Sequence, residues 1–137
     1  MNDEKYSHTG GGTLFQHLCN VFRLLDRTRS FPGHWAVAGL WHSIYGTQYY
    51  DKGQGEEISR DFVKDMIGEP AEKLVHEFCT MKNRTQSIIE GDNMGLKAIE
   101  YANILDINNH SQNEKREGLI VQLNEQLTDH FKEEVKS

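Results

Sequence analysis

The sequence has few of the features that mark secreted, membrane or nucleic-acid-binding proteins. It contains two cysteines, Cys19 and Cys79, without CxxC spacing, so a disulfide scaffold is not expected and a reducing cytoplasm is the simpler location. No stretch approaches the roughly 18 apolar residues that span a bilayer, and no signal-peptide core is present. An excess of basic charge is also missing, since 21 acidic and 15 basic residues give a net charge of −6. We therefore expect a cytoplasmic protein with neither a nucleic-acid nor a membrane partner.

The length and composition of the chain are sufficient for one folded domain. The chain has 137 residues, in the usual range for one compact unit, and we expect a single domain over residues 1–137. Hydrophobic residues make up 36% and charged residues 26%, which is enough for a modest core and too hydrophobic for disorder. Apolar residues recur at helical spacing, and no segment alternates like a strand. We therefore predict an all-α fold, a compact bundle of about six helices.

Spacing and end signals place the predicted helices. Thr13 can cap a helix over residues 14–27. The nearly all-apolar segment 35–44 is expected to be the central, buried helix. Ser59 can cap a short helix that stops at Gly68. The other predicted helices start at Pro70, cover residues 96–107 and include Ile120 to Phe131, with residues 83–95 as a polar connection.

Four polar residues are predicted to point inward, and three predicted helices contribute them. They are His17, His42, Ser43 and Asn103. The core of a helical bundle is where facing helices build metal or ligand sites. A single inward histidine is more often a hydrogen-bonded core residue than a ligand, but two histidines with an amide make that interpretation less secure. Both interpretations stay open.

Two segments resemble the HD-domain superfamily, and the guanosine-tetraphosphate hydrolases in particular. The runs GTLFQHLCNVFRLL and AVAGLWHSIYGT match the family's two metal-histidine helices, so the resemblance implies metal ligation by His17 and His42. LKAIEYANILD is similar to the helix that bears the family's last metal carboxylate. HSIYGT and EYAN are closer still to a small HD-like family catalogued as domain of unknown function 6817. The likeness to the HD superfamily covers about residues 10–110 and implies an HD-like bundle. The residues shared with the smaller family are His8, His17, His42, Tyr45 and Asn103.

The carboxylates of the HD pattern are replaced in this chain. Ser43 stands at the aspartate of the HD pair, Gly46 and Thr47 replace an acidic pair, and Asn103 replaces the distal aspartate. Two imidazoles, a hydroxyl and an amide would hold hard cations weakly. The candidate cofactor is therefore a transition metal, with zinc, iron and copper favoured over manganese.

A complete metal site needs further ligands beside His17 and His42. His8 is the expected third ligand, because a run of glycines lets it fold over the helix mouth, and Asp106 is a possible fourth. Three protein ligands and an open position form a catalytic arrangement. The alternatives are that His8 is a mobile terminal residue and that Asp106 is a solvated acid at a helix end.

These residues support three functions that the sequence does not separate. The first is a metal-dependent enzyme, an HD-like hydrolase or oxygenase acting on a small polar or phosphorylated substrate. The second is a metal-free pocket that binds a ligand or performs acid–base chemistry. The third is a partner-binding protein or homodimer in which aromatic side chains form the interface. The candidate catalytic residues are His17, His42, Tyr45 and Asn103, although Tyr45 can equally serve packing.

Overall fold

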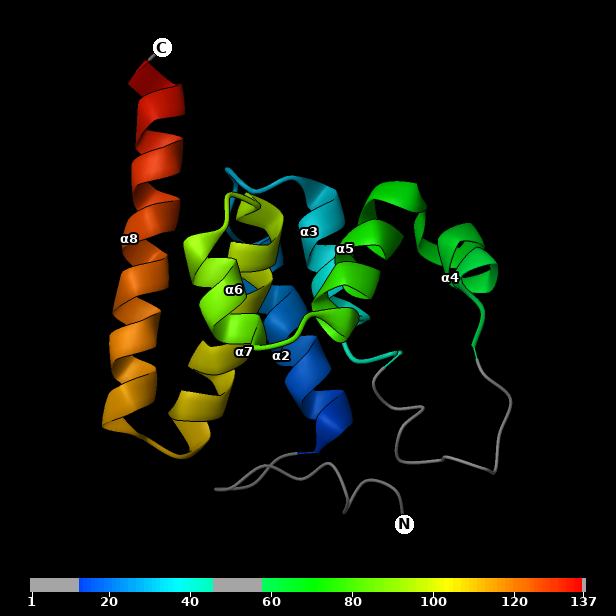
Figure 1. Ribbon diagram of the computed structural model, residues 1–137, viewed down its shortest axis with the longest axis horizontal. Coiled ribbons are helices and arrows are strands. Elements are labelled where there is room, and N and C mark those ends of the chain that lie inside the picture. The colour runs from blue at the N-terminus through cyan, green and yellow to red at the C-terminus, as the bar shows by residue number, and fades with distance from the viewer. Residues whose placement is uncertain (1–12, 46–57, 137) are drawn as a thin grey trace.

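The computed structural model describes residues 13–45 and 58–136, with the backbone alone for 132–136, and these ranges form a helical bundle. Helices are the only regular elements of these ranges, which confirms the predicted all-α fold. Figure 1 shows the bundle as a compact body with its longest helix along one side. In chain order the helices are α2 (Leu14–Asp26), α3 (Gly33–Leu40), α4 (Arg60–Ile67), α5 (Glu69–Thr80), α6 (Arg84–Glu90), α7 (Met94–His110) and α8 (Glu114–Lys136).

Side-chain caps explain where two of the predicted helices begin. The Oγ1 atom of Thr13 accepts a hydrogen bond from the backbone N–H of Gln16 at 3.1 Å. The Oγ atom of Ser59 accepts one from the backbone N–H of Phe62 at 3.0 Å. Each cap satisfies a donor that has no partner inside its helix. Gly68 ends α4 with a φ of 90°, a conformation that residues with a Cβ rarely adopt.

The centre of the bundle is α7, so the prediction that segment 35–44 forms the central helix is wrong. α7 contacts α2, α3, α5, α6 and α8, whereas α3 contacts α2, α5 and α7. α7 is buried on nearly every side although it carries charged and amide side chains. Apolar patterning did not reveal this position, because those polar groups are paired with partners on other helices.

Two helix boundaries also differ from the predicted ones. α3 ends at Leu40, and a turn over residues 41–45 carries His42 and Tyr45. The segment 83–95, predicted as a connection, contains the short helix α6. α6 forms because Ile88 and Ile89 anchor it in the core, and α7 contacts it along this side.

Lys97 shows how α7 accommodates a buried charge. Its side chain is 2% exposed, and burial lowers its pKa. The Nζ atom donates to the carbonyl oxygens of Ile88 and Ile89 at 2.9 Å and to Oε1 of Gln126 at 2.6 Å. All three donor positions of an ammonium group are used. Lys97 thus ties α7 to α6 and α8.

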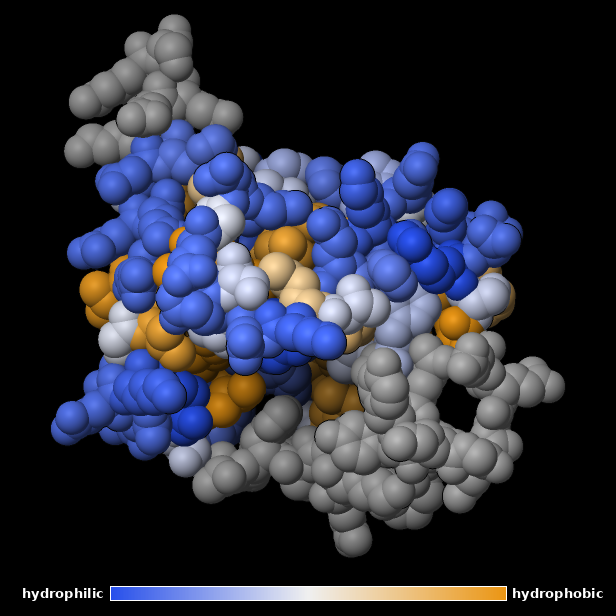
Figure 2. Space-filling view, viewed as in Figure 1, coloured by the Kyte–Doolittle hydropathy of each residue, from blue (hydrophilic) through white to orange (hydrophobic). Residues whose placement is uncertain are grey.

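The face drawn in Figure 2 is mostly hydrophilic, with apolar patches that show chiefly along the α8 side. The large apolar side chains that are most exposed in the described ranges are Phe15, Phe62, Met66 and Val121. Among the described helices, none combines the length and the apolar character needed to cross a membrane.

The contact between α2 and α3 gives the first prediction. A Cβ at Gly39 would lie 2.5 Å from Cδ1 of Leu25 and 2.9 Å from Cγ1 of Val21. We therefore expect Gly39→Ala to lower the free energy of unfolding by about 1–3 kcal/mol, the usual cost of overpacking. Chemical denaturation measures this change. Gly33→Ala on the same helix is the matched control, because a Cβ there meets nothing within 4 Å. Equal effects of the two substitutions would contradict the prediction.

Candidate functional site

His17 and His42 lie side by side in the core. His17 comes from the buried face of α2, and His42 from the turn that follows α3. The side chains are 3% and 5% exposed, and their ring centroids are 5.4 Å apart in an edge-to-face arrangement. Asn103, on α7, is buried beside them. The structure thus brings together three of the residues that the sequence singled out.

Both ring nitrogens of His17 bond to side chains of α7. Nδ1 lies 2.7 Å from Oδ2 of Asp106, and Nε2 lies 2.7 Å from Oδ1 of Asn103. Asp106 also accepts a hydrogen bond from Nδ2 of Asn20 at 3.0 Å. Asp106 is 4% exposed, so the interpretation of this residue as a solvated helix-end acid is wrong. Its carboxylate is instead held by two side chains of α2.

The hydrogen-bond pattern assigns the protons on His17. Nδ2 of Asn103 donates to Oε1 of Glu100 at 3.1 Å, which turns the amide oxygen of Asn103 towards His17. An amide oxygen accepts only, so Nε2 of His17 is the donor in that bond. Nδ1 is likewise the donor to the carboxylate of Asp106. Both ring nitrogens of His17 therefore face acceptor oxygens on α7.

His42 is held in its neutral form. Its Nδ1 donates to the carbonyl oxygen of Gly39 at 2.6 Å. Burial is the main cause that lowers the pKa of His42 to about 4, and the positive charge of His17 lowers it further. His42 is therefore neutral near pH 7, with its lone pair on Nε2. A side-chain hydrogen bond with Asn103 partly opposes the lowering of this pKa.

Glu100 is a buried carboxylate near the histidines that sequence patterning missed. Its side chain is 1% exposed. It accepts hydrogen bonds from Asn103 and Thr85 and lies 3.7 Å from Nε of Arg84. Glu100, Asn103 and Asp106 are spaced by three residues, so they share one face of a helix. The three-residue spacing from Asn103 is the sequence signal that could have identified Glu100 as a buried residue.

Arg84 is a second missed residue. Its guanidinium lies 4.2 Å from the centroid of the Phe78 ring, and that ring is 5.3 Å from the ring of His42. The charge of Arg84 also contributes to lowering the pKa of His42. A cation stacked on an aromatic face is thereby placed next to the histidine pair.

Tyr45 belongs to another polar cluster. Its hydroxyl donates to Oε2 of Glu72 at 2.8 Å, and Arg60 bonds to both oxygens of Glu72 at 2.7 and 2.9 Å. Burial is the first cause that raises the pKa of Tyr45. The hydrogen bonds from Arg60 are the main cause that lowers the pKa of Glu72. This cluster ties the turn after α3 to α4 and α5, which favours a packing role for Tyr45 over a catalytic one.

The remaining predicted site residues are only partly placed. Ser43 is half-buried beside His42. His8, Gly46 and Thr47 lie outside the described residues, so ligation by His8 stays a prediction. Within residues 13–45 and 58–136, no group of three His, Cys, Asp or Glu side chains has the arrangement of a metal site.

Comparison with known families bears on this geometry. The family model described as domain of unknown function (DUF6817) matches residues 1–83, more than half of the chain. The chain is a member of the DUF6817 family. The matched segment of this DUF6817 protein contains His17 and His42, whereas their partners Asn103 and Asp106 lie beyond it. No curated protein and no solved structure matches the chain.

The neutral state of His42 makes stability depend on pH. Its pKa is about 4 in the folded protein and 6.5 in the unfolded chain, so the unfolded state takes up the proton first as the pH falls. This contribution is complete above pH 6.5 and is lost between 6.5 and 4. Between about pH 7.5 and about pH 5 we expect His42 to account for a loss of about 2 kcal/mol.

Urea denaturation at the two pH values measures the loss. His42→Gln should remove this part of the pH dependence. His34→Gln, which changes a half-buried histidine outside the network, is the matched control. If His42→Gln kept the full pH dependence of the parent protein, the assignment of a buried neutral imidazole would be wrong.

Proposed function

We propose that this protein is a divergent HD-like enzyme that holds a transition metal at His17, His42 and Asn103 and acts on a small anionic substrate. One observation carries the proposal. Each histidine donates its Nδ1 hydrogen to a fixed acceptor, the carboxylate of Asp106 or the carbonyl of Gly39. Metal-binding histidines almost always have such a partner, which orients the ring and raises the basicity of the other nitrogen.

The donor set suits a borderline metal better than a hard one. Nε2 of His17 bonds to Oδ1 of Asn103, and the ring of His42, which also has a side-chain hydrogen bond with Asn103, lies 5.4 Å from that of His17, so two imidazoles and an amide oxygen are close together. Neutral nitrogen donors favour zinc, iron or copper, and manganese or magnesium would bind weakly. Binding requires loss of the proton on Nε2 of His17. A bound metal supplies Lewis acidity that lowers the pKa of a water ligand.

Arg84 supports an anionic substrate, such as a phosphorylated small molecule. Its guanidinium is fixed on the Phe78 ring beside His42, while Glu100 is near enough to orient it. The Nε atom of Arg84 is buried without a hydrogen-bond partner in the described part of the chain. Guanidinium groups bind phosphate and carboxylate oxygens through paired donors. The positive charge at this point would therefore select for a negative group.

A metal-free acid–base protein is the second candidate, and one observation favours it. The rings of His17 and His42 lie with their centroids 5.4 Å apart, and each ring is oriented by a fixed partner, Asp106 or Gly39. Histidine pairs of this kind transfer protons without a metal. The two candidates differ in whether ligand binding survives chelation of metal ions.

Metal binding is tested with Co²⁺, whose visible absorption reports nitrogen ligation. Starting from metal-free protein, we expect one equivalent to bind, and His17→Ala and His42→Ala to abolish binding. Asp106→Asn should weaken it by about 10- to 100-fold, as loss of a partner behind a ligand does. Asn103→Asp should tighten it, because an anionic oxygen replaces a neutral one.

His34→Ala is the matched control and should leave Co²⁺ binding unchanged. If both site variants bound Co²⁺ as the parent protein does, the metal proposal would fail. If the parent bound no Co²⁺ but a phosphorylated ligand stabilised it in the presence of a chelator, the metal-free candidate would replace it.

The role of Arg84 is tested by thermal unfolding with inorganic phosphate and nucleoside monophosphates. We expect these anions to raise the melting temperature of the parent protein, and Arg84→Gln to reduce that rise at least by half. Arg27→Gln, an exposed arginine that follows α2, is the matched control and should keep the full response. An undiminished response in Arg84→Gln would place the anion elsewhere.

A further inference from the structure

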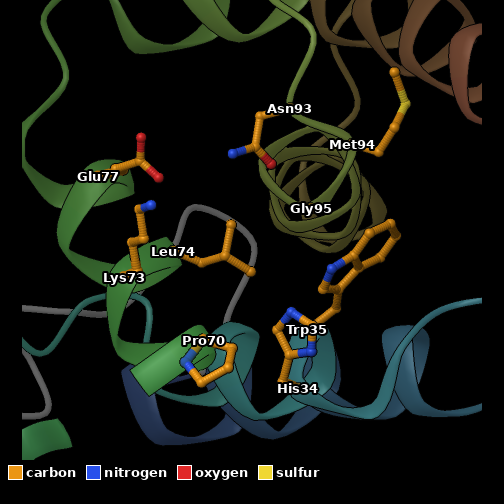
Figure 3. Close-up of a pocket in the computed structure, with 9 residues that line it drawn as sticks. All are labelled: His34, Trp35, Pro70, Lys73, Leu74, Glu77, Asn93, Met94 and Gly95. Atoms are coloured by element: carbon orange, nitrogen blue, oxygen red, sulfur yellow. The ribbon is translucent and has the colours of Figure 1, made fainter. Parts of the chain in front are cut away.

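A cavity lies away from the histidine pair. It has a volume of about 360 Å³ and opens between α3, α5 and the first turn of α7. Figure 3 shows it with Trp35 on α3, Lys73 and Leu74 on α5, and Gly95 at the start of α7. None of its lining residues belongs to the network of His17, so a ligand bound in this cavity would be independent of the proposed function.

The indole N–H of Trp35 is the feature that points to a ligand. Trp35 is 8% exposed and lines the cavity, yet its Nε1 bonds to no residue in the part of the chain that the structure describes. Figure 3 shows the nitrogen-bearing edge of the ring turned towards Leu74, across the cavity. The fully buried side-chain nitrogen and oxygen atoms without a hydrogen-bond partner in the described ranges are Nε of Arg84 and Nε of Arg116, so the indole N–H of Trp35 is reached from the cavity and can donate to a ligand there. A bound molecule with an acceptor oxygen would accept this hydrogen bond.

The surroundings of Trp35 favour a negatively charged acceptor. α7 is 17 residues long and its first turn borders the cavity. Asn93 caps this end through the N–H of Leu96, which leaves the N–H groups of Met94 and Gly95 without an acceptor inside the helix. These groups and the helix dipole attract an anion. Lys73 adds an ammonium group from α5.

The absence of a side chain at Gly95 keeps the approach to Trp35 open. A Cβ at this position would lie 3.0 Å from Nε1 of Trp35 and 3.0 Å from both Cδ atoms of Leu74. Any larger residue would crowd the indole N–H and narrow the cavity. Pro70, Leu74 and Met94 supply apolar surface for the rest of a ligand.

Glu77 limits how much negative charge the cavity accepts. It lies one turn after Lys73 on α5 and lines the same cavity. Figure 3 shows both head groups on the α5 side. A carboxylate at this place repels a second negative charge on a ligand. The cavity is therefore better suited to a monoanion than to a phosphate.

We propose that this cavity binds a small monocarboxylate with an apolar body. The carboxylate accepts hydrogen bonds from the indole N–H of Trp35 and from the start of α7, with Lys73 as counter-ion, and the apolar body lies on Leu74 and Pro70. This site is separate from the histidine centre and needs no metal.

The direct test is nuclear magnetic resonance on the ¹⁵N-labelled full chain, titrated with phenylacetate and hexanoate. We expect the indole N–H signal of Trp35 to move downfield and that of Trp41 to stay in place. Trp35→Phe assigns the signal, because the indole N–H is removed. It should also weaken binding about 5-fold, which corresponds to the free energy of one lost hydrogen bond. Phenylacetamide and hexanamide, which keep the shape and lose the charge, should bind at least 5-fold more weakly.

Charge substitutions on α5 give a test that does not disturb the core. Lys73→Gln should weaken phenylacetate binding about 10-fold at low salt. Glu77→Gln should tighten it, since a repulsive charge is removed. Lys82→Gln, an exposed lysine outside the cavity, is the matched control and should change nothing. The proposal is overturned if the acids and amides bind equally, if the Trp35 signal does not move, or if Lys73→Gln and Lys82→Gln behave alike.

Discussion

The hydrogen bonds of His17 to Asp106 and Asn103 form the interaction on which the rest of this structure depends. They join α2 to α7 through two bonds of 2.7 Å inside the core. An imidazole and a carboxylate at this depth are tolerated only because their polar atoms find partners. Asn20 donates a hydrogen bond to the carboxylate of Asp106, and Glu100 accepts one from the amide of Asn103. α7 can therefore occupy the centre of the bundle while carrying charged side chains.

This network also creates the difference between the two histidines. Burial is the main cause that lowers the pKa of His42, and the nearby His17 lowers it further, so His42 stays neutral. Two side chains of the same type thus have distinct chemistry in one small volume. The metal and the acid–base proposals draw on the same asymmetry, because a ligand nitrogen and a proton acceptor both need a free lone pair. Arg84 adds a fixed positive charge at the edge of that volume.

Helical spacing predicted the inward position of some of the buried polar residues. His17 and Asn103 lie beside apolar stripes on their helices, and both are buried. Spacing could not predict their pairing, because the contact of His17 with Asp106 spans 89 positions of sequence. It also failed for Asp106, since an acid at a helix end is indistinguishable from a buried one until the opposite helix is known. The hydrogen bond of Tyr45 could not be predicted for the same reason, because its partner Glu72 lies on another helix.

The position of α7 late in the chain has a consequence for biosynthesis. A nascent chain that has emerged only as far as residue 83 contains both histidines and neither Asn103 nor Asp106. Until α7 emerges, the imidazoles remain in water, and the apolar faces of α2 and α3 have no central helix to cover them. The closing contact is long-range, which favours late and cooperative assembly over stepwise folding from the N-terminus. In the cell, the growing polypeptide would therefore be most exposed to chaperones and proteases just before α7 is made.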